Sequence, residues 1–575
     1  MDKKNKNTSK LKTELPGISM EFSAKTRKGF IKKLQSEQFD ILIIGGGITG
    51  AGIARDAALR GYRTALIEKD DFAAGTSSKS SKLIHGGIRY LQHMEFGLVH
   101  EALLERKTLM DIAPHLVHPI EVLFPVYKGS SVPAWMVKIG MLLYDGLSFS
   151  KRIGLHRLIP IGKNDKPERL LLKKGLEKLF MYYDSRADDT RLVMANIQSA
   201  ALNSAITANY IKAVDVIQED GQVKGLKVQD QLSGKKFEVN AHLVCNATGP
   251  WNDFVRGELF NDNKQRLRPT KGIHFVVRRK DLDIKRTMIL STIQDERPVF
   301  VIPWREFVIL GTTDTYFEGD PDWVDISVDD VDYLLESYNH YFPKANLTKD
   351  KVLSVYSGLR PLTLEEGKSA GEVTREYQIF EGPQNFFNIL GGKLTTYRTM
   401  AEEMVNRLGN ALSDHLGILA RNSKCTTDKL PLNGGDIKNY EQFESEWTEK
   451  LIRNGFEKDT AKNLIESYGE NLSEALTIIS SRKNGTDKII NNLPYLWGEI
   501  DYCCHYEMTL ALDDFLMRRT HLFSLDPNQA QDVHLAVADR MAEILDWSGK
   551  EKKRQIENYK KKVEMVQSFR VGAVS

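Results

Sequence analysis

Residues 76–90 combine the side chains and the backbone that an anion-binding site requires. The segment reads TSSKSSKLIHGGIRY and holds four serines, two lysines, a histidine, an arginine and a glycine pair. Hydroxyls and cations bind phosphate oxygens, and a Gly-Gly turn lets the chain approach a ligand closely. We therefore expect this segment to contact an anionic ligand or cofactor.

A dinucleotide-binding signature precedes this segment. Residues 39–44 (FDILII) and 63–68 (RTALIE) predict two strands, and GGGITGAGIARDAALRG between them predicts a glycine turn that opens a helix. The glycines permit a tight turn, close approach to a pyrophosphate and close helix packing, while the acid after the second strand can accept hydrogen bonds from a ribose. The predicted dinucleotide contacts are Gly45, Gly47, Gly50 and Glu68.

Two later segments extend the predicted cofactor site. Residues 386–405, FFNILGGKLTTYRTMAEEMV, predict a strand, a glycine turn and a helix start whose N–H groups can stabilise negative charge on a reduced flavin. Residues 246–251, NATGPW, predict another glycine turn after a buried strand. Contacts at both ends of the chain favour FAD as the cofactor.

The elements that must position these residues alternate between strands and helices up to residue 415. Helical periodicity marks 95–113 and 188–205, short strands fill 206–248 around a hairpin at Asp220-Gly221, and further strands lie between 274 and 315. This pattern predicts an α/β nucleotide-binding domain interleaved with an antiparallel-sheet domain, followed by helices. The expected divisions are a tail and lead-in helix (1–38), the interleaved domains (39–415), a linker (416–435) and a helical C-terminal domain (436–575).

Composition excludes several classes of protein. The 575 residues include 80 basic and 77 acidic ones, a net charge of +3, which opposes a nucleic-acid-binding role. The four cysteines fit no metal spacing and indicate a reducing compartment. Residues 134–149, AWMVKIGMLLYDGLSF, are too short and too polar to span a membrane. They predict either a partly buried core helix or a helix on a membrane surface.

The order and spacing of several motifs resemble the FAD-dependent glycerol-3-phosphate dehydrogenase family. These motifs are GGGITGAGIARDAALRG, TSSKSSKLIHGGIRYL, NATGPW, GIHFVV, GTTDT, SGLRPL, TRE, GGKLTTYR and YEMTLALDDFLMRRT. The resemblance covers about residues 39–410 and continues into the helical region. It implies a glutathione-reductase-like FAD domain and oxidation of sn-glycerol 3-phosphate to dihydroxyacetone phosphate, with electrons passed to a membrane quinone in glycerol catabolism.

The resemblance also implies roles for individual residues. His274 is the expected general base, because an ordinary histidine pKa suits proton abstraction near neutral pH, and Arg360 is expected to polarise the reacting oxygen. The expected substrate contacts are Arg89, Tyr90, Arg375 and Lys393, with the arginines suited to binding phosphate and Lys393 in the first turn of a helix. The expected cofactor contacts beyond the glycine signature are Ser77, Ser78, Ser81, Lys82, Leu83, Thr248, Gly249, Gly391, Gly392, Lys393, Leu394 and Thr395.

The electron acceptor separates the alternatives that stay open. Oxidases of the resembled family carry a long insertion between the segments matching SGLRPL and TRE, whereas only thirteen residues separate Arg360 from Thr374 here, which favours the quinone-linked type. Other interpretations are an O2-using oxidase, an amine or amino-acid oxidase of the same fold, and a non-catalytic FAD-dependent redox sensor. We expect a cytoplasmic protein peripherally bound to the membrane through 134–149 or the basic residues 549–562, and a homodimer is one alternative for its oligomeric state.

Overall fold

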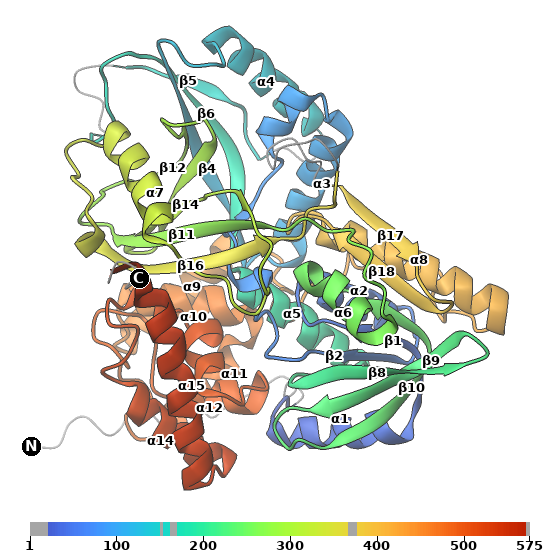
Figure 1. The fold of residues 1–575 in the computed structure, drawn as a ribbon. Helices are drawn as coiled ribbons and strands as arrows, with labels where there is room; N and C mark the ends of the chain where they lie inside the picture. Colours follow the sequence, from blue (N-terminus) through green and yellow to red (C-terminus); the bar gives the residue numbers. More distant parts are fainter. Residues whose placement is uncertain (1–20, 150–152, 162–168, 366–375, 571–575) are drawn as a thin grey trace, which may run out of the picture.

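Two mixed β-sheets and a group of C-terminal helices make up the molecule (Figure 1). The structure is a computed structural model, and it describes residues 21–149, 153–161, 169–365 and 376–570. These layers confirm the predicted α/β fold followed by a helical region.

The first sheet has a parallel centre built from buried strands. Strand β1 lies between β10 and β2, with β7 beyond β2 and β18 beyond β10, and all of these neighbours run parallel. An antiparallel strand, β17, closes one edge, and the β8–β9 hairpin pairs with β10. The strands are β1 (Gln38–Ile44), β2 (Thr64–Ile67), β7 (Ile206–Ala208), β8 (Ile211–Glu219), β9 (Gln222–Asp230), β10 (Lys236–Asn246), β17 (Tyr377–Glu381) and β18 (Phe386–Gly391).

The second sheet is antiparallel except where β12 runs parallel to β4. Strand β11, next to one edge of this sheet, pairs with both β14 and β16, which brings two motifs distant in sequence side by side. The strands are β3 (Leu83–Ile84), β4 (Val117–Tyr127), β5 (Arg157–Ile159), β6 (Leu176–Ala187), β11 (Thr270–Arg278), β12 (Thr287–Ser291), β13 (Pro298–Trp304), β14 (Phe307–Gly311), β15 (Thr315–Tyr316) and β16 (Val352–Arg360).

Helices cover the sheets and form the C-terminal region. Helix α2 packs against α5 and α8 beside the first sheet, and the last helices pack against β16 and one another. The helices before residue 420 are α1 (Ala24–Ser36), α2 (Ile48–Leu59), α3 (Phe96–Ile112), α4 (Ala134–Leu147), α5 (Asp189–Leu202), α6 (Asn252–Phe260), α7 (Val328–Tyr341) and α8 (Tyr397–Leu416). Those after it are α9 (Tyr440–Arg453), α10 (Lys458–Tyr468), α11 (Leu472–Ser481), α12 (Glu499–Tyr506), α13 (Leu522–Leu525), α14 (His534–Leu545) and α15 (Gly549–Gln567).

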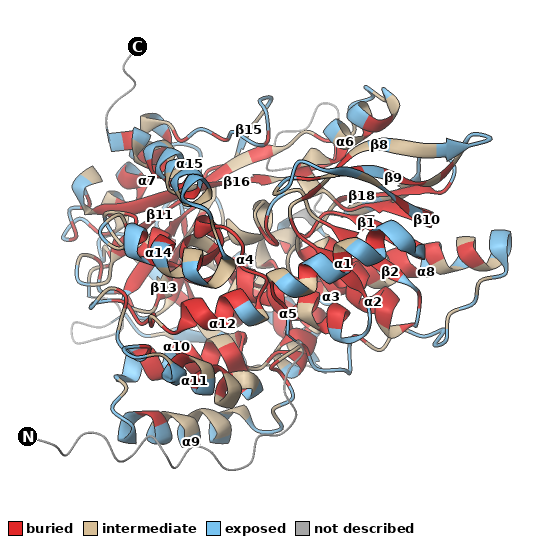
Figure 2. Cartoon of the chain, turned by 90° about the horizontal axis from the view of Figure 1, so that it is seen from below, coloured by how far each residue is buried: buried red, intermediate tan, exposed pale blue. Residues whose placement is uncertain are grey.

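The C-terminal helices share an apolar core with the second sheet. Buried residues of β11 and β13 belong to the same cluster as buried residues of α10, α12 and α15 (Figure 2). Removing such contacts from water contributes roughly 25 cal/mol per Å² of apolar surface. The helical region therefore packs closely against the sheet domains. The residue boundaries between the domains stay a prediction from the sequence.

Three deeply placed histidines predict how stability depends on pH. Burial lowers the pKa of His115 to about 3, that of His118 to about 4 and that of His274 to about 3. Below the ordinary histidine pKa, near 6.5, these histidines bind protons in the unfolded chain but stay neutral in the folded chain. We expect the free energy of unfolding to decrease as the pH is lowered below about 6.5. The decrease should be up to about 1.4 kcal/mol per pH unit for each histidine.

Urea midpoints at about pH 7.5 and about pH 5 measure this effect. The variant His118→Gln should show a smaller loss between the two conditions, because one proton-binding group of the unfolded chain is gone. A wild-type midpoint that is equal at both pH values would contradict the neutral burial of these rings.

Candidate cofactor and substrate site

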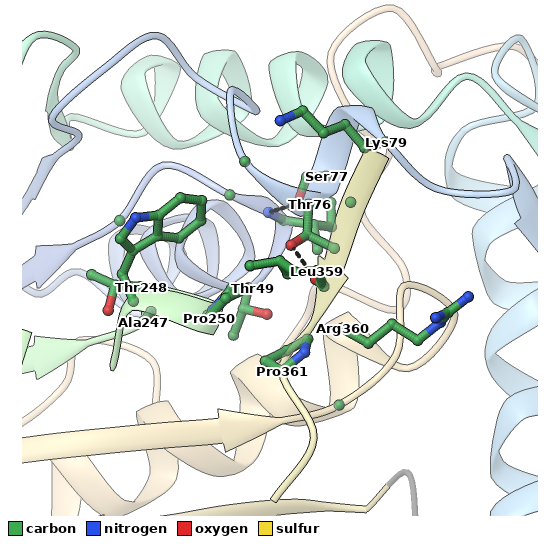
Figure 3. A pocket seen from close by; sticks show the side chains of 18 of the residues that line it. Thr49, Thr76, Ser77, Lys79, Ala247, Thr248, Pro250, Leu359, Arg360 and Pro361 are labelled. Carbon is green, nitrogen blue, oxygen red and sulfur yellow. Dashed lines mark hydrogen bonds between the residues drawn. The ribbon is translucent and has the colours of Figure 1, made fainter. Parts of the chain in front are cut away.

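One large cavity opens at the carboxyl ends of the parallel strands, where β1, β2, β10 and β18 end. Its volume is about 670 Å³, which is within the range of ligand sites in proteins. The wall residues come from segments that are far apart in the chain, as the side chains in Figure 3 show. These segments are 44–49, 68–90, 211–213, 247–258, 272–274, 318–322, 358–362 and 389–394.

The glycine signature forms the part of the cavity wall next to helix α2. Gly45 has a φ of +113°, and a Cβ atom there would lie 2.7 Å from the carbonyl oxygen of Ala247. A Cβ at Gly50 would lie 1.9 Å from the carbonyl oxygen of Gly45, so the helix and the strand can pack only with glycine at this position. Gly45 and Gly47 line the cavity, and Gly50 supports them from behind. Bare backbone and a helix N-terminus suit the diphosphate of a dinucleotide.

Glu68 follows β2 and reaches back across the glycine turn. Its carboxylate accepts hydrogen bonds from the backbone N–H groups of Gly46 at 2.7 Å and Asp70 at 2.9 Å. Burial raises the pKa of Glu68 to about 7, and the nearby Asp70 adds to the effect. The carboxylate lines the cavity at the position expected for a group that binds a ribose.

Only part of the serine-rich segment faces the cavity. Ser77, Ser81 and Leu83 line it, and the Ser77 hydroxyl accepts a hydrogen bond from the Ile48 N–H at 3.0 Å. Ser78 instead donates to the Gly75 carbonyl at 3.2 Å, and Lys82 forms a buried ion pair with Asp189. Neither Ser78 nor Lys82 is part of the cavity wall.

The later glycine turns complete this side of the cavity. The wall residues here, as the glycine motifs predict, are Thr248, Gly249, Gly391, Gly392, Lys393 and Leu394. Thr395 lies behind the wall, where its hydroxyl accepts a hydrogen bond from the His85 N–H at 3.1 Å.

The position of Lys393 differs from the expectation of a first-turn residue. Helix α8 begins at Tyr397, and residues 394–396 form a bend and a turn before it. Lys393 therefore lies in the loop between β18 and the helix. The glycine pair at 391–392, with φ angles of +76° and +101°, turns the chain so that this loop still faces the cavity.

His274 lies in β11 with its ring held on two sides. Nε2 shares a hydrogen bond with the Ser81 hydroxyl at 2.8 Å, and the ring stacks on Tyr356 with centroids 4.9 Å apart. Burial, with added repulsion from Arg360 and Lys82, lowers its pKa to about 3. The expectation of an ordinary pKa is therefore wrong, because the ring is almost fully buried beside two cations. The imidazole is therefore neutral at physiological pH, so it can accept a proton without first losing one.

Arg360 ends β16, where it pairs with Thr270 of β11, the strand that also carries His274. Its guanidinium donates to Asp314 Oδ1 and Thr312 Oγ1, each at 3.0 Å, and to the Thr313 carbonyl at 3.2 Å. A Cβ at Gly272 would lie 2.6 Å from this guanidinium, so glycine leaves the room that the arginine occupies. Sheet pairing of β16 with β11 thus brings the SGLRPL and GIHFVV motifs together in the cavity wall.

The remaining predicted substrate contacts divide into three cases. Tyr90 and Lys393 both line the cavity, and the Lys393 Nζ lies 3.7 Å from the centroid of the Tyr90 ring. Arg89 is half-buried next to Tyr90 but is not part of the cavity wall. Arg375 lies outside the described residues. His85, for which the sequence indicates no definite role, also lines the cavity, and burial lowers its pKa.

Several wall residues have weaker signals in the sequence. Lys79, the other lysine of the serine-rich segment, lines the cavity, and burial together with Lys562 and Arg518 lowers its pKa to about 8. Trp251 of NATGPW donates its indole N–H to Asp322 at 2.7 Å, and Asp322 also pairs with Lys69. Lys79 and Trp251 lie inside recognised motifs, whereas nothing in the sequence around Asp322 indicates more than a loop.

The fold and this cavity define a flavin-dependent oxidoreductase. Residues 40–407 match the model of the FAD-dependent oxidoreductase family, and residues 425–552 match the C-terminal domain of alpha-glycerophosphate oxidase. An aerobic glycerol-3-phosphate dehydrogenase of Staphylococcus haemolyticus is 35% identical over 533 residues, which cover 92% of this chain and 95% of the relative. The relative in Staphylococcus aureus strain USA300 is 35% identical over 550 residues, covering 95% and 97%.

A solved structure supports the same assignment. The glycerol-3-phosphate dehydrogenase from Bacillus halodurans, complexed with FAD, has a TM-score of 0.77 and 31% identity, covering 95% of this chain and 98% of its own. The chain belongs to the family of FAD-dependent glycerol-3-phosphate dehydrogenases. FAD is its cofactor, and the glycine turns, Glu68 and the cavity of about 670 Å³ fit that molecule. An alpha-glycerophosphate oxidase from Mycoplasma pneumoniae, at 18% identity and a TM-score of 0.52, shares the fold.

Proposed function

We propose that this enzyme oxidises sn-glycerol 3-phosphate to dihydroxyacetone phosphate and passes the electrons to a membrane quinone. FAD supplies the hydride acceptor for this reaction. The observation that carries the proposal is that His274 and Arg360, from the paired strands β11 and β16, both line the cavity that also holds the dinucleotide signature. A base and a cation beside a flavin site are what oxidation of an alcohol requires.

The proposed division of labour follows from the geometry. His274 accepts the hydroxyl proton, and its contacts with Ser81 and Tyr356 fix the orientation of the ring. Arg360 stabilises the alkoxide that develops on the same oxygen, because Asp314 and Thr312 hold its guanidinium in place. Tyr90 and Lys393, which also line the cavity and lie against each other, are the proposed contacts for the phosphate, with Arg89 supporting them.

Anaerobic titration of the holoenzyme tests the substrate assignment. We expect glycerol 3-phosphate to bleach the flavin absorbance completely, while glycine and sarcosine leave it unchanged, because the site presents several cations for a dianionic phosphate. Bleaching by an amino acid and not by glycerol 3-phosphate would overturn the proposed reaction. Exposing the reduced enzyme to air then tests the acceptor, since rapid stoichiometric peroxide would indicate an oxidase.

Helix α4 supports contact with a membrane. Trp135, Ile139, Leu142 and Leu143 are 62%, 48%, 55% and 42% exposed, and their spacing places them on one side of the helix. The opposite side, with Val137, Met141 and Tyr144, is buried. No helix in the described part of the chain is long and apolar enough to cross a bilayer. The exposed side of α4 is therefore the proposed contact with the bilayer interface.

The basic helix α15 is a different case. Figure 1 shows α4 and α15 at opposite ends of the molecule. Several of the lysines on α15 take part in ion pairs, as Lys552 does with Asp539 and Lys562 with Asp513. The apolar helix is thus the better candidate, and α15 presents a solvated face.

Polar substitutions on α4 should weaken binding to vesicles. We expect the double variant Ile139→Gln, Leu142→Gln to bind about ten-fold or more weakly, because two half-exposed apolar side chains contribute about 2 kcal/mol on insertion. Co-sedimentation with vesicles of anionic and neutral phospholipid measures this change. The control Leu535→Gln alters an equally exposed leucine on α14 and should bind like the wild type. Equal binding of all three proteins would contradict the role of α4.

A further inference from the structure

The C-terminal helical region contributes no side chain to the cavity wall among the described residues, yet it holds one wall segment from behind. The loop after β2 places Lys69, Asp70, Gly75, Thr76 and Ser77 in the wall. Asp71, in the middle of this loop, points instead into the boundary with the C-terminal helices, where it is fully buried. Its partners there explain what the helical region does for the site.

Two consecutive arginines bind the Asp71 carboxylate. Arg519 donates from Nη1 to Oδ2 at 2.7 Å and from Nη2 to Oδ1 at 2.9 Å, which is a bidentate contact. Arg518 donates from Nε to Oδ2 at 2.7 Å, and Asn209 Nδ2 adds a fourth hydrogen bond at 3.1 Å. Burial alone would raise the pKa of Asp71, but the two guanidinium groups hold it below its ordinary value.

The arginines are themselves fixed by the C-terminal region. Arg518 pairs with Asp513 and Asp514, and Arg519 donates to the Glu507 carbonyl at 2.8 Å. They lie in a π-helical segment, Asp514–Arg519. Such segments are rare and frequently mark functional positions. The arrangement presents two adjacent side chains to one carboxylate.

A buried ion pair is weak evidence for a role in stability, because packed apolar side chains of similar volume stabilise as well or better. The location of the contact between Asp71 and the two arginines therefore says more about its role than its strength does. It joins the C-terminal helices to the loop that runs from Glu68 to Ser77, and both of these ends face the cavity. The C-terminal region also affects the pKa of Lys79 in the cavity wall, because Lys562 and Arg518 contribute to lowering it.

We propose that Arg518 and Arg519 position the cavity loop 69–77 through Asp71 and thereby determine how tightly FAD is held. Asp71 and the two arginines are positioning residues, since none of them lines the cavity. The C-terminal helical region thus acts as a brace for the cofactor site. Its effect is on retention of FAD, and it is separate from substrate oxidation and from the electron acceptor.

The test compares Asp71→Asn with Glu466→Gln in the holoenzyme. Glu466 pairs with Arg186 at 2.8 Å across the same boundary, but neither residue lines the cavity, so this variant is a matched carboxylate-to-amide control. The rate of FAD release after dilution is read from the rise of free-flavin fluorescence. We expect release from Asp71→Asn to be about ten-fold faster or more, and release from Glu466→Gln to stay within about two-fold of the wild type.

A second variant and a second measurement keep the test decisive. Arg519→Lys keeps the charge but loses the bidentate contact, and should release FAD about three-fold faster or more. Hydrogen exchange of residues 69–77 should be faster in both variants and unchanged in the control. If Asp71→Asn fails to fold, Arg519→Lys decides by the same two measurements. If the variants released FAD and exchanged the loop amides at wild-type rates, and only their Tm were lower, the contact of Asp71 with the arginines would be purely structural. That result would overturn the proposal.

Discussion

Replacing His274 by Asn should slow flavin reduction by glycerol 3-phosphate by about 10²–10⁴-fold, the range typical for loss of a general base. Asn cannot accept the hydroxyl proton, while its amide retains a polar contact near Ser81. FAD content should stay at the wild-type value, because His274 lies in the second sheet and not in the glycine turns. Stopped-flow reduction under anaerobic conditions isolates this step from reoxidation.

The pH dependence of the same step follows from the lowered pKa. Since the pKa of His274 is about 3, the ring is already neutral at pH 5 and above, so acidification to about pH 5 should not remove the base. Any loss of rate in this range should follow ionisation of the substrate phosphate, whose second pKa is near 6. A matched variant, Tyr356→Phe, keeps the stacking on His274 and should change the rate by less than about ten-fold. Near-normal reduction in His274→Asn would rule out the proposed base.

Replacing Gly50 by Ala should abolish FAD binding. The added methyl group would lie 1.9 Å from the Gly45 carbonyl oxygen, and only a shift of α2 or of the glycine turn can relieve the overlap. Either shift moves the helix N-terminus and Gly47 away from the positions that bind the diphosphate. We expect the purified variant to be colourless and to unfold at least about 2 kcal/mol more easily.

The matched control for this substitution is Gly97→Ala. Gly97 lies in helix α3, and nothing lies within 4 Å of its added Cβ. Alanine in a helix is favoured over glycine by up to about 1 kcal/mol, so the control should bind FAD fully and be as stable as the wild type or more so. The flavin-to-protein absorbance ratio compares the two variants. A yellow Gly50→Ala protein with wild-type stability would show that the close packing of α2 is not required.

The local patterns of the sequence predict well which residues of the dinucleotide signature line the cavity. A buried strand, three spaced glycines and an acid after the second strand act through backbone geometry over about thirty residues, so their consequence is nearly independent of distant contacts. Gly45, Gly47 and Glu68 accordingly line the cavity. The same argument holds for the glycine turn at 391–392, whose conformation depends on positive φ angles.

Side chains whose direction depends on distant elements are harder to predict. Lys79 and Lys82 are three residues apart and chemically alike, but only Lys79 reaches the cavity, because Asp189 of α5 binds Lys82. The pKa of His274 depends on burial under another strand and on Arg360, which is 86 residues away in the chain. No local pattern carries such information.

The class of fold, the cofactor and the family follow from the amino-acid order alone, because glycine spacing, strand patterns and an ordered set of motifs are local properties. The exposed side of helix α4 and the neighbours of His274 became known only from the folded molecule. The same is true of the contact of Arg518 and Arg519 with Asp71, a residue 447 positions earlier than Arg518. The physical reason is that burial and ion pairing depend on which elements pack together, and such packing is set by the whole chain.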